Sequence, residues 1–411
     1  MPRSGIDRDV AVIFSAAFVR SSTVGLVGLV LAIYLAQAGF SLTAIGAIVG
    51  VGMAGAAVAT LIAGFRGDVF GRRRTMAALA VLTAAGYASV CMADRALVLV
   101  PVAFITMLNG MGRDRGAASA IEQALLTAVT DDRSRTWLFA WYNVVLDGGH
   151  AFGALAGAVP ILFVRWLHVD SLRAHRLTFL ACAAAMAISA ASYTRLSTRI
   201  ELAAEPHHDR RPRLSPQATR AVTRLAMLFG IDSLGGGFLS STLIAYWFFE
   251  RFGASEATLA GLFFSARVLN AVGHLAAAWI ARRIGLVNTM VLTHLPSSLF
   301  IMAAPLAPTA TIAGLLFLCR EALVEMDVPT RQSYVMAIMA PGERSAASGV
   351  TNVTRSVGWA AGPSMAGFVM QHALAAPLLI GGTLKIAYDI LLYASFRRVV
   401  PPEERAPEGP G

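Results

Sequence analysis

Long apolar segments recur along the whole chain, separated by short stretches of glycine, proline or charge. Apolar runs of about 20 residues are long enough to cross a lipid bilayer as helices. The alternating apolar and polar period of a transmembrane barrel is absent from these runs. The pattern therefore predicts an all-α polytopic membrane protein of twelve transmembrane helices, near residues 10–37, 42–64, 75–93, 97–128, 136–163, 175–194, 222–249, 256–280, 288–306, 310–339, 346–371 and 376–396.

Composition and charge support this prediction. Of the 411 residues, 56% are hydrophobic and 14% are charged, whereas about 25% of the residues of a soluble domain are charged. The net charge of +10 would favour nucleic acid as a partner of a soluble protein, but here the basic residues lie in short runs between apolar stretches. We therefore expect a lipid bilayer around the protein, a small-molecule substrate, no nucleic acid partner, and no metal or cofactor.

Arginine is distributed unevenly between alternate loops. One set of loops holds most of it, including Arg72, Arg73, Arg282 and the stretch 195–220. Cytoplasmic loops of membrane proteins carry an excess of Lys and Arg. The distribution therefore predicts a multi-pass protein of the cytoplasmic (inner) membrane with both termini in the cytoplasm, whose first apolar segment is retained as a helix.

A polar segment with three prolines, 196–220, divides the chain into two blocks of similar size. We expect an N-terminal six-helix bundle at 1–195, a cytoplasmic linker at 196–220, a C-terminal six-helix bundle at 221–398, and a disordered cytoplasmic tail at 399–411. The blocks match in order at offsets of 209 to 214 residues, so that Gly39 falls on Gly253 and Gly71 on Gly285. Such a match is typical of two parallel repeats with a substrate site between them.

The turn between the second and third predicted helices carries a motif. It reads Gly64, three residues, Asp68, two residues, and then Gly71 followed by three arginines. It resembles the signature of the major facilitator superfamily of secondary transporters, with Val69 where that family has a basic residue. The resemblance implies two pseudo-symmetric six-helix bundles and a cytoplasmic gate, whose residues here are Gly64, Asp68, Gly71, Arg72, Arg73, Arg282 and Gly285.

A second motif places small residues four apart in the fifth and eleventh helices. Its members are Gly149, Gly153 and Gly157, and then Gly358, Gly362 and Pro363. It resembles the Gly-rich motif of drug and proton antiporters, although Ala154 replaces the proline of the fifth helix. Small residues also permit close helix packing without any role in antiport, so both interpretations stay open.

Ionisable residues within the predicted helices are the main candidates for substrate binding or coupling. Charged groups that face lipid cost several kcal/mol, so they generally face a bundle interior or a water-filled cavity. The resemblance implies that the first, fourth, seventh and tenth helices line the cavity, and most of the charge lies there. The candidates are Arg20, Arg113, Asp114, Arg115, Glu122, Asp147, His150, Asp232, Arg320, Glu321, Glu325, Asp327 and Arg331.

The repeat gives some of these charges expected partners. Arg20 aligns with Asp232, and Glu122 aligns with Arg331, so opposite charges occupy related positions. We expect Arg20 and Asp232 to pair across the cavity and exchange partners with substrate or protons. For Arg20 and Asp232 the alternative is a fixed structural ion pair. For Glu122 and Arg331 an ion pair that forms a gate is as well supported as a role in binding.

Further pairs follow from helical spacing. Glu321 and Glu325 share a helix face, whereas Arg320 is expected to point elsewhere. Two close carboxylates in a low dielectric favour sharing a proton, which a proton-coupling site requires; a structural polar network is the alternative. Asp147 and His150 are candidates for a proton relay. Lys385 and Asp389, on an outer helix, are expected to be structural or interface-related. Tyr34 and Tyr246 are repeat mates and candidates for an external gate or for interfacial belt positions.

Together these features predict a secondary active transporter. No phosphate-binding loop, dinucleotide motif or hydrolase motif occurs in the sequence, so we expect no enzyme activity and no ATP drive. The main prediction is a monomer that exports a drug or metabolite by proton antiport through alternating access. One alternative is proton-coupled movement of an organic anion. It is favoured because Arg pairs with carboxylates and phosphates, and the arginines concerned are Arg20, Arg113, Arg115, Arg320 and Arg331. Another is a transport-inactive sensor or scaffold.

Overall fold

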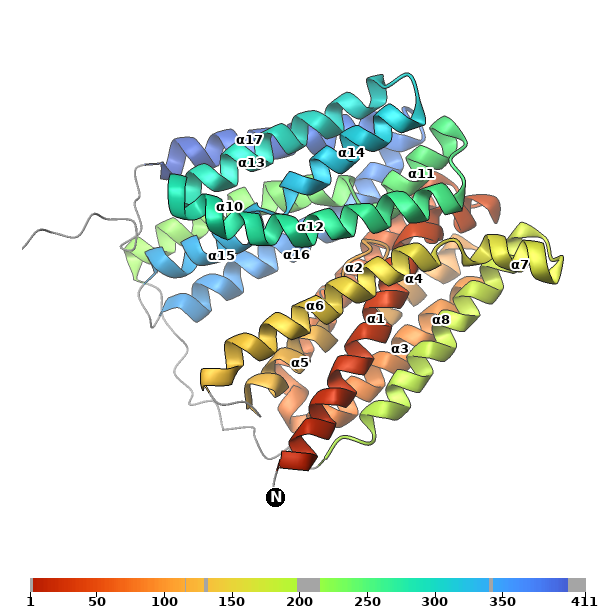
Figure 1. The fold of residues 1–411 in the computed structure, drawn as a ribbon, viewed down its shortest axis with the longest axis horizontal. Helices are drawn as coiled ribbons and strands as arrows, with labels where there is room; N and C mark the ends of the chain where they lie inside the picture. The colour runs from red at the N-terminus through yellow and green to blue at the C-terminus, as the bar shows by residue number, and fades with distance from the viewer. Residues whose placement is uncertain (1–2, 115, 129–131, 198–214, 340–342, 398–411) are drawn as a thin grey trace, which may run out of the picture. The chain divides into compact units, whose positions relative to one another are not determined.

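The computed structural model describes residues 3–114, 116–128, 132–197, 215–339 and 343–397, and every regular element in these residues is a helix (Figure 1). The first half of the chain contains α1 (Arg3–Gln37), α2 (Leu42–Phe70), α3 (Arg72–Met92), α4 (Ala96–Thr106), α5 (Ala117–Ala128), α6 (Asp132–Ala156), α7 (Val159–Leu167) and α8 (Ser171–Tyr193). The second half contains α10 (Pro216–Phe238), α11 (Ser241–Phe252), α12 (Glu256–Ile284), α13 (Leu286–Ala303), the short 3-10 helix η1 (Ala304–Leu306), α14 (Ala310–Val324), α15 (Asp327–Ile338), α16 (Arg344–Met370) and α17 (Ala376–Phe396).

Nine helical stretches within the described residues are long and apolar enough to cross a bilayer. They are Arg8–Gln37, Leu42–Ala63, Arg72–Met92, Trp141–Leu167, Ser171–Tyr193, Pro216–Phe252, Glu256–Ile284, Leu286–Leu306 and Ala376–Phe396. The predicted spans near 97–128 and 310–339 are each broken into two shorter helices, and the span near 346–371 corresponds to α16, which contains Pro363. The polytopic helical class is therefore confirmed, and the count of twelve stays a prediction.

Two of these breaks lie at equivalent places in the repeat. In the fourth predicted span, α4 ends at Thr106 and α5 begins at Ala117. In the tenth, α14 ends at Val324 and α15 begins at Asp327. Pro329 therefore lies in the first turn of α15, where a missing backbone N–H is tolerated. Non-helical backbone at membrane depth is stable only where protein or water satisfies its polar groups, so each break marks a polar interior.

The turns between the second and third helices of each half share one backbone geometry. Gly71 separates α2 from α3 with φ 86°, and Gly285 separates α12 from α13 with φ 84°. A side chain at such a φ value clashes with the backbone, so glycine is favoured. The internal repeat thus preserves a turn as well as a sequence pattern.

By spatial contacts the chain forms two compact units. Unit 1 comprises Met1–His208, Ser240–Phe264 and Pro363–Leu374. Unit 2 comprises Asp209–Leu239, Ser265–Gly362 and Ala375–Gly411. Residues 198–214 and 398–411, which hold most of the predicted linker and the predicted tail, lie outside the described residues. The division into two six-helix bundles therefore stays a prediction.

In unit 1, α1 is the helix around which the others pack. It contacts α6, α8 and α11, while α3 packs on α8 and α2 packs on α4. Glycines of α6 allow a close contact with α1. A Cβ atom on Gly149 would lie 2.7 Å from Ser21 Cβ, and one on Gly153 would meet the carbonyl oxygen of Ser22. A Cβ atom on Gly157 would meet the side chain of Leu29. The Gly-rich motif of the fifth predicted span is thus a helix-packing surface.

In unit 2, α17 packs on both α10 and α13, and α13 also packs on α14 and α15. Buried apolar residues of these helices, such as Phe229, Met290 and Tyr388, form one core. A Cβ atom on Gly358 of α16 would meet backbone atoms of Gly230 and Leu234 on α10 at 2.8 Å. The same motif therefore lies in a close helix contact in each half of the chain.

Candidate functional site

A buried arginine in the middle of α1 organises the first polar site. Arg20 is 5% exposed. Its Nε atom donates to Asp114 Oδ2 at 2.5 Å, and its Nη1 and Nη2 atoms donate to the two oxygens of Glu122, each at 2.6 Å. Glu122 lies on α5, and Asp114 lies in the non-helical segment that joins α4 to α5. We call Arg20, Asp114, Glu122, Tyr142 and Tyr193 the Arg20 cluster.

Glu122 is the saturated carboxylate of the Arg20 cluster. It is fully buried. Besides the two bonds from Arg20, it accepts a hydrogen bond from Tyr193 on Oε1 and one from Tyr142 on Oε2, both at 2.7 Å. The bidentate contact with Arg is the strong form of a charge-assisted pair. With four donors around it, Glu122 holds the guanidinium in a fixed position.

Asp114 is held less completely than Glu122. Its Oδ2 atom accepts from Arg20 Nε, while its Oδ1 atom lies 3.5 Å from the backbone nitrogen of Gly116. The backbone N–H of Asp114 donates to His150 Nε2 of α6 at 2.9 Å. His150 therefore supports the non-helical segment, and its ring nitrogen acts there as an acceptor. A proton relay between Asp147 and His150 stays a prediction.

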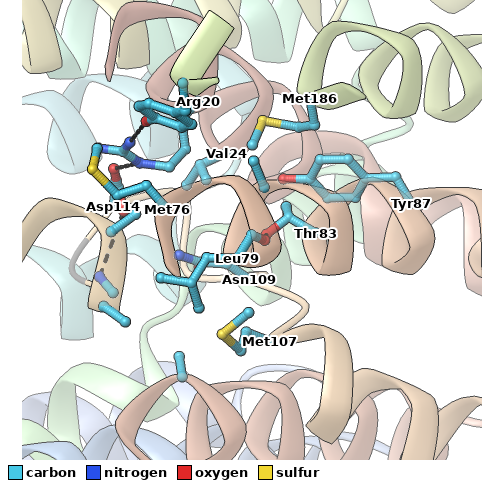
Figure 2. A pocket seen from close by; sticks show the side chains of 16 residues that line it. Arg20, Val24, Met76, Leu79, Thr83, Tyr87, Met107, Asn109, Asp114 and Met186 are labelled. Atoms are coloured by element: carbon cyan, nitrogen blue, oxygen red, sulfur yellow. Dashed lines mark hydrogen bonds and ion pairs between the residues drawn. The ribbon is translucent and has the colours of Figure 1, made fainter. Parts of the chain in front are cut away.

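Asp114 is one of the residues that line a small cavity in unit 1 (Figure 2). Its lining includes Arg20, Asp114, Asn109, Thr83 and Tyr87, and Figure 2 shows Asp114 and Arg20 together at one end of it. The hydroxyl of Tyr87 is buried, and no hydrogen-bond partner for it occurs among the described residues. The space open to the centre of a water-sized sphere is about 50 Å³, which accommodates a few water molecules. It is far smaller than the roughly 300–1,000 Å³ of a site for a drug-sized ligand.

A second polar site lies in unit 2 around Asp232 of α10. Asp232 Oδ1 accepts from Lys385 Nζ at 2.7 Å, and its Oδ2 accepts from Arg331 Nη1 at 3.0 Å. Arg331 Nη1 also donates to Asp327 Oδ2 at 2.8 Å. His294 of α13 lies between Lys385 and Asp389 of α17. We call these six residues, all less than 9% exposed, the Asp232 network.

The partners of Arg20 and Asp232 correct one prediction. The repeat alignment predicted that these two residues pair with each other. Instead, Arg20 pairs with Glu122 inside unit 1, and Asp232 pairs with Arg331 inside unit 2. The alignment identified the right positions, because the same two repeat positions form an ion pair in each half with the signs exchanged. Opposite charges at related repeat positions were assumed to pair with each other. This assumption was wrong, since each charge has its partner in its own half of the chain.

Sequence reasoning missed the part of α17 and α13 that completes the Asp232 network. Lys385 and Asp389 were predicted to be structural residues on an outer helix, and His294 was not a candidate. In the structure all three are buried: Lys385 contacts Asp232 and His294, and Asp389 contacts His294. A signal was present in the composition, because Lys385 is the single lysine of the chain. A lone lysine in an apolar span, among arginines elsewhere, indicates a specific partner.

The glutamates of the tenth predicted span do not pair as predicted. Glu321 Oε1 accepts from Arg320, so the prediction that Arg320 points elsewhere is wrong. Glu321 Oε2 accepts from Asn270 of α12 at 2.7 Å. Glu325, at the break between α14 and α15, lies 3.6 Å from His274 of α12. Each carboxylate thus has its own polar partner from Arg320 or α12.

The remaining candidates lie in several places. Arg115 is outside the described part of the structure, and so are the surroundings of Gly64 and the side chain of Asp68. Near the turn at Gly71, Arg73 Nη1 donates to the backbone oxygen of Leu196 at 3.2 Å, and Arg282 is exposed. Arg72, Arg113 and Asp147 are partly buried. The gate function of this motif stays a prediction.

The two tyrosines of the predicted external gate have different surroundings. Tyr34 is buried, donates to the backbone oxygen of Val90 at 3.2 Å, and stacks on His175 with 5.9 Å between ring centroids. His175 Nε2 lies 2.9 Å from Glu256 Oε1 within unit 1. Tyr246 is buried and its hydroxyl lies 3.4 Å from Glu250. Their role as a gate stays a prediction.

Comparisons with known proteins place these sites in a family. The family model described as Major Facilitator Superfamily matches residues 13–407. The chain is 25% identical over 422 residues to the uncharacterized membrane protein YJR124C of Saccharomyces cerevisiae, covering 95% of this chain and 94% of the relative.

Solved structures share the fold at low sequence identity. A mutant of the nucleoside transporter NupG has a TM-score of 0.75 at 13% identity, covering 94% of this chain and 100% of its own. The D-xylose-proton symporter has a TM-score of 0.72 at 14% identity, covering 96% of this chain and 98% of its own. With the family match over nearly the whole chain, the conclusion is direct: the protein belongs to the Major Facilitator Superfamily and is a secondary transporter, not an enzyme.

Proposed function

We propose that this transporter couples export of a drug or metabolite to proton entry by antiport, and that Asp114 is the carboxylate that exchanges the proton. One observation carries the proposal. Asp114 lines the water-sized cavity of unit 1 and bonds to Arg20 through a single oxygen, whereas Glu122 has four donors. The two carboxylates of the Arg20 cluster are therefore unequal, and of the two only Asp114 lines this cavity.

The charge of the Arg20 cluster favours binding of one proton. Its charged groups are one guanidinium and two carboxylates, so the cluster has one excess negative charge in a buried position. An uncompensated charge away from water is costly. A proton on Glu122 would disrupt hydrogen bonds from two tyrosines and the bidentate contact with Arg20. A proton on Asp114 Oδ1 leaves those contacts intact, so Asp114 is the site that we assign.

The position of Asp114 links this proton to a movable part of the chain. Asp114 lies in the non-helical segment between α4 and α5, and broken helices of this kind hold coupling-ion sites in many transporters. Protonation removes the charge that attracts Arg20 Nε, so this segment can shift relative to α1. A D-xylose-proton symporter shares this fold, which supports proton coupling as an activity that the fold can perform. The proposal keeps the monomer and the cytoplasmic position of both termini as expectations from the sequence.

The competing anion transporter is less well supported by the contacts. An organic anion would be bound by arginines in the polar sites, but Arg20 is already bonded to Asp114 and Glu122, and Arg331 to Asp232 and Asp327. An anion would have to displace a carboxylate from a buried site. A cationic or neutral substrate avoids this cost. The sensor or scaffold alternative predicts that neutral substitution of Asp114 leaves the activity of the protein unchanged.

The test uses the purified full chain. Substrate candidates are first found as lipophilic cations, organic anions or neutral solutes that raise the melting temperature, because a ligand bound only by the native state stabilises it. The protein is then reconstituted into vesicles that contain a pH-sensitive dye. We expect the stabilising compounds to drive proton movement in wild-type vesicles and not in Asp114→Asn vesicles.

A matched control and a clear contrary result complete the test. Asp94, exposed between α3 and α4, provides the control, and Asp94→Asn should transport like the wild type. Proton movement at the wild-type level in a folded Asp114→Asn protein would remove Asp114 from the mechanism. If a stabilising anion moves with protons in the same direction, the symport alternative replaces antiport.

A further inference from the structure

We propose that His294 and Asp389 in unit 2 form a second proton-binding site, which controls the contact between Lys385 and Asp232. The part that this site plays in transport rests on the proposed function. Proton binding at the site can be measured without any transport. The site lies on α13 and α17, in a different unit from Asp114.

Distances around the His294 ring define its protonation state. The Nδ1 atom lies 2.9 Å and 3.1 Å from the two oxygens of Asp389. The Nε2 atom lies 3.2 Å from Lys385 Nζ. An ammonium group has donors only and a carboxylate has acceptors only. Nε2 is therefore an acceptor and Nδ1 carries the hydrogen, which makes the imidazole neutral in this arrangement.

The Asp232 network then contains a surplus negative charge. Its carboxylates are Asp232, Asp327 and Asp389, and its cations are Arg331 and Lys385. His294 is 1% exposed and Asp389 is fully buried, so water does not screen the surplus. One added proton would make the network neutral, and neutrality is favoured in a buried site.

The contacts assign that proton to one pair of residues. Asp232 faces a cation with each of its oxygens, and Asp327 faces Arg331. Asp389 differs from both, because its contact within the described part of the chain is the neutral His294. The carboxylate without a Lys or Arg contact is the one whose charge is least compensated. The proton therefore belongs to the His294–Asp389 pair.

Helices α10 and α17 bring charged and aromatic groups to the His294 ring. Asp232 Oδ1 of α10 lies 3.7 Å from Nε2, and the Tyr388 ring of α17 meets the imidazole edge-on with 5.8 Å between centroids. Arg331 of α15 donates to Asp232, and Asp327 is linked to Asp232 through Arg331. The ionisable residues Arg320 and Glu321 of α14 contact each other. The proton at this site is thus influenced mainly by Asp389, Lys385 and Asp232.

Proton binding would change the position of Lys385. In the neutral ring, Nε2 accepts a hydrogen bond from the ammonium group of Lys385. An imidazolium has hydrogen on both nitrogens, so its Nε2–H repels that ammonium group. Asp232 Oδ1 is the nearest acceptor for the new Nε2–H. Lys385 must give up its contact with His294 and share or lose Asp232. The proton state of α13 and α17 is in this way transmitted to the ion pair between α10 and α15.

Nuclear magnetic resonance of histidine-labelled protein tests this site directly. The chain has eight histidines, and His294→Gln identifies the signal of His294 by its loss. In wild-type protein we expect a neutral ring with hydrogen on Nδ1 at about pH 8, and uptake of one proton on titration to about pH 5. In Asp389→Asn we expect this uptake to be lost. His372→Gln, which alters an exposed histidine, should leave the signal of His294 unchanged.

The outcomes separate this proposal from the proposed function. A His294 ring that carries its hydrogen on Nε2, or that takes up no proton over this range, overturns the second site and leaves Asp114 as the exchanging carboxylate. Uptake that persists in folded Asp389→Asn also overturns the pair. If His294 titrates as expected while vesicles show no substrate-driven proton movement, the second site stands and antiport fails. The signal should be retained in Asp114→Asn, because Asp114 belongs to unit 1.

Discussion

The unequal carboxylates of the Arg20 cluster give a prediction that stability and transport can be separated by two conservative substitutions. Glu122→Gln removes the charge that receives four hydrogen bonds, from Arg20, Tyr142 and Tyr193. Asp114→Asn removes the charge that receives one bond from Arg20. We expect Glu122→Gln to affect mainly the free energy of unfolding, and Asp114→Asn to affect mainly transport.

The structure gives the expected magnitudes. Removing one partner of a buried ion pair costs about 3–5 kcal/mol, and Glu122 is fully buried with both oxygens engaged. The amide of Gln also presents hydrogen atoms to two of the former donors. For Asp114, a single charged hydrogen bond contributes about 1.5–3 kcal/mol, and the cavity allows water to replace it. Glu122→Gln should therefore be more destabilising by roughly 2 kcal/mol.

Thermal unfolding of the detergent-solubilised protein provides the assay. Because such proteins often unfold irreversibly, variants are compared at one heating rate. We expect the apparent melting temperature to fall in the order wild type, Asp114→Asn, Glu122→Gln. Tyr142→Phe removes one of the four bonds on Glu122 and should lie between the wild type and Glu122→Gln. The reasoning is refuted if Glu122→Gln melts at or above the temperature of Asp114→Asn.

Three further predictions concern local structure. Each is measured by the same melting assay, and the one on Asp170 also by hydrogen exchange. Gly153→Ala should lower the melting temperature because its Cβ atom would meet α1, whereas Gly148→Ala, with nothing within 4 Å, should be neutral or slightly stabilising; equal effects would contradict the packing role. Asp170→Ala should cost about 1 kcal/mol by loss of the N-cap of α8, and an unchanged α8 terminus in hydrogen exchange would contradict this. Gly71→Ala and Gly285→Ala should each cost about 1–2 kcal/mol because of positive φ, and a harmless substitution would show that the turn can relax.

Much of the fold was predictable from the sequence because the bilayer restricts the possible structures. Apolar length alone identifies most spans, and the ordered matches between halves predicted the shared turn at Gly71 and Gly285. The breaks at 107–116 and 325–326 were not predicted. Hydropathy does not distinguish a continuous apolar helix from two short ones.

The polar site was predictable in its members and not in its pairing. Arg20, Glu122, Asp232 and Arg331 were identified as charges in apolar spans at related positions. Their partners could not be derived, because a pairing depends on helix rotation, and a change of one residue turns a helix by about 100°. The burial of Lys385 was missed for a related reason. An outer helix has one face toward its bundle, and α17 directs that face to α10 and α13.

The exchanged signs of the two ion pairs imply that the two halves of the transporter handle protons differently. Coulomb attraction is the same when the signs of a pair are exchanged, so a duplicated geometry is preserved with either polarity. Proton binding is not symmetric in this way, because a carboxylate accepts a proton and a guanidinium keeps its own. In unit 1 the broken span carries Glu122 and Asp114, whereas in unit 2 the equivalent span carries Arg331, and Asp232 lies on the unbroken α10 between two cations. At this repeat position a proton can therefore act on the broken span in unit 1, whereas Arg331 keeps its own proton in unit 2. The unit 2 span also carries the carboxylates Glu321, Glu325 and Asp327, which contact Arg320, His274 and Arg331 respectively. The proposed second site lies outside this span, on α13 and α17, where Asp389 contacts His294.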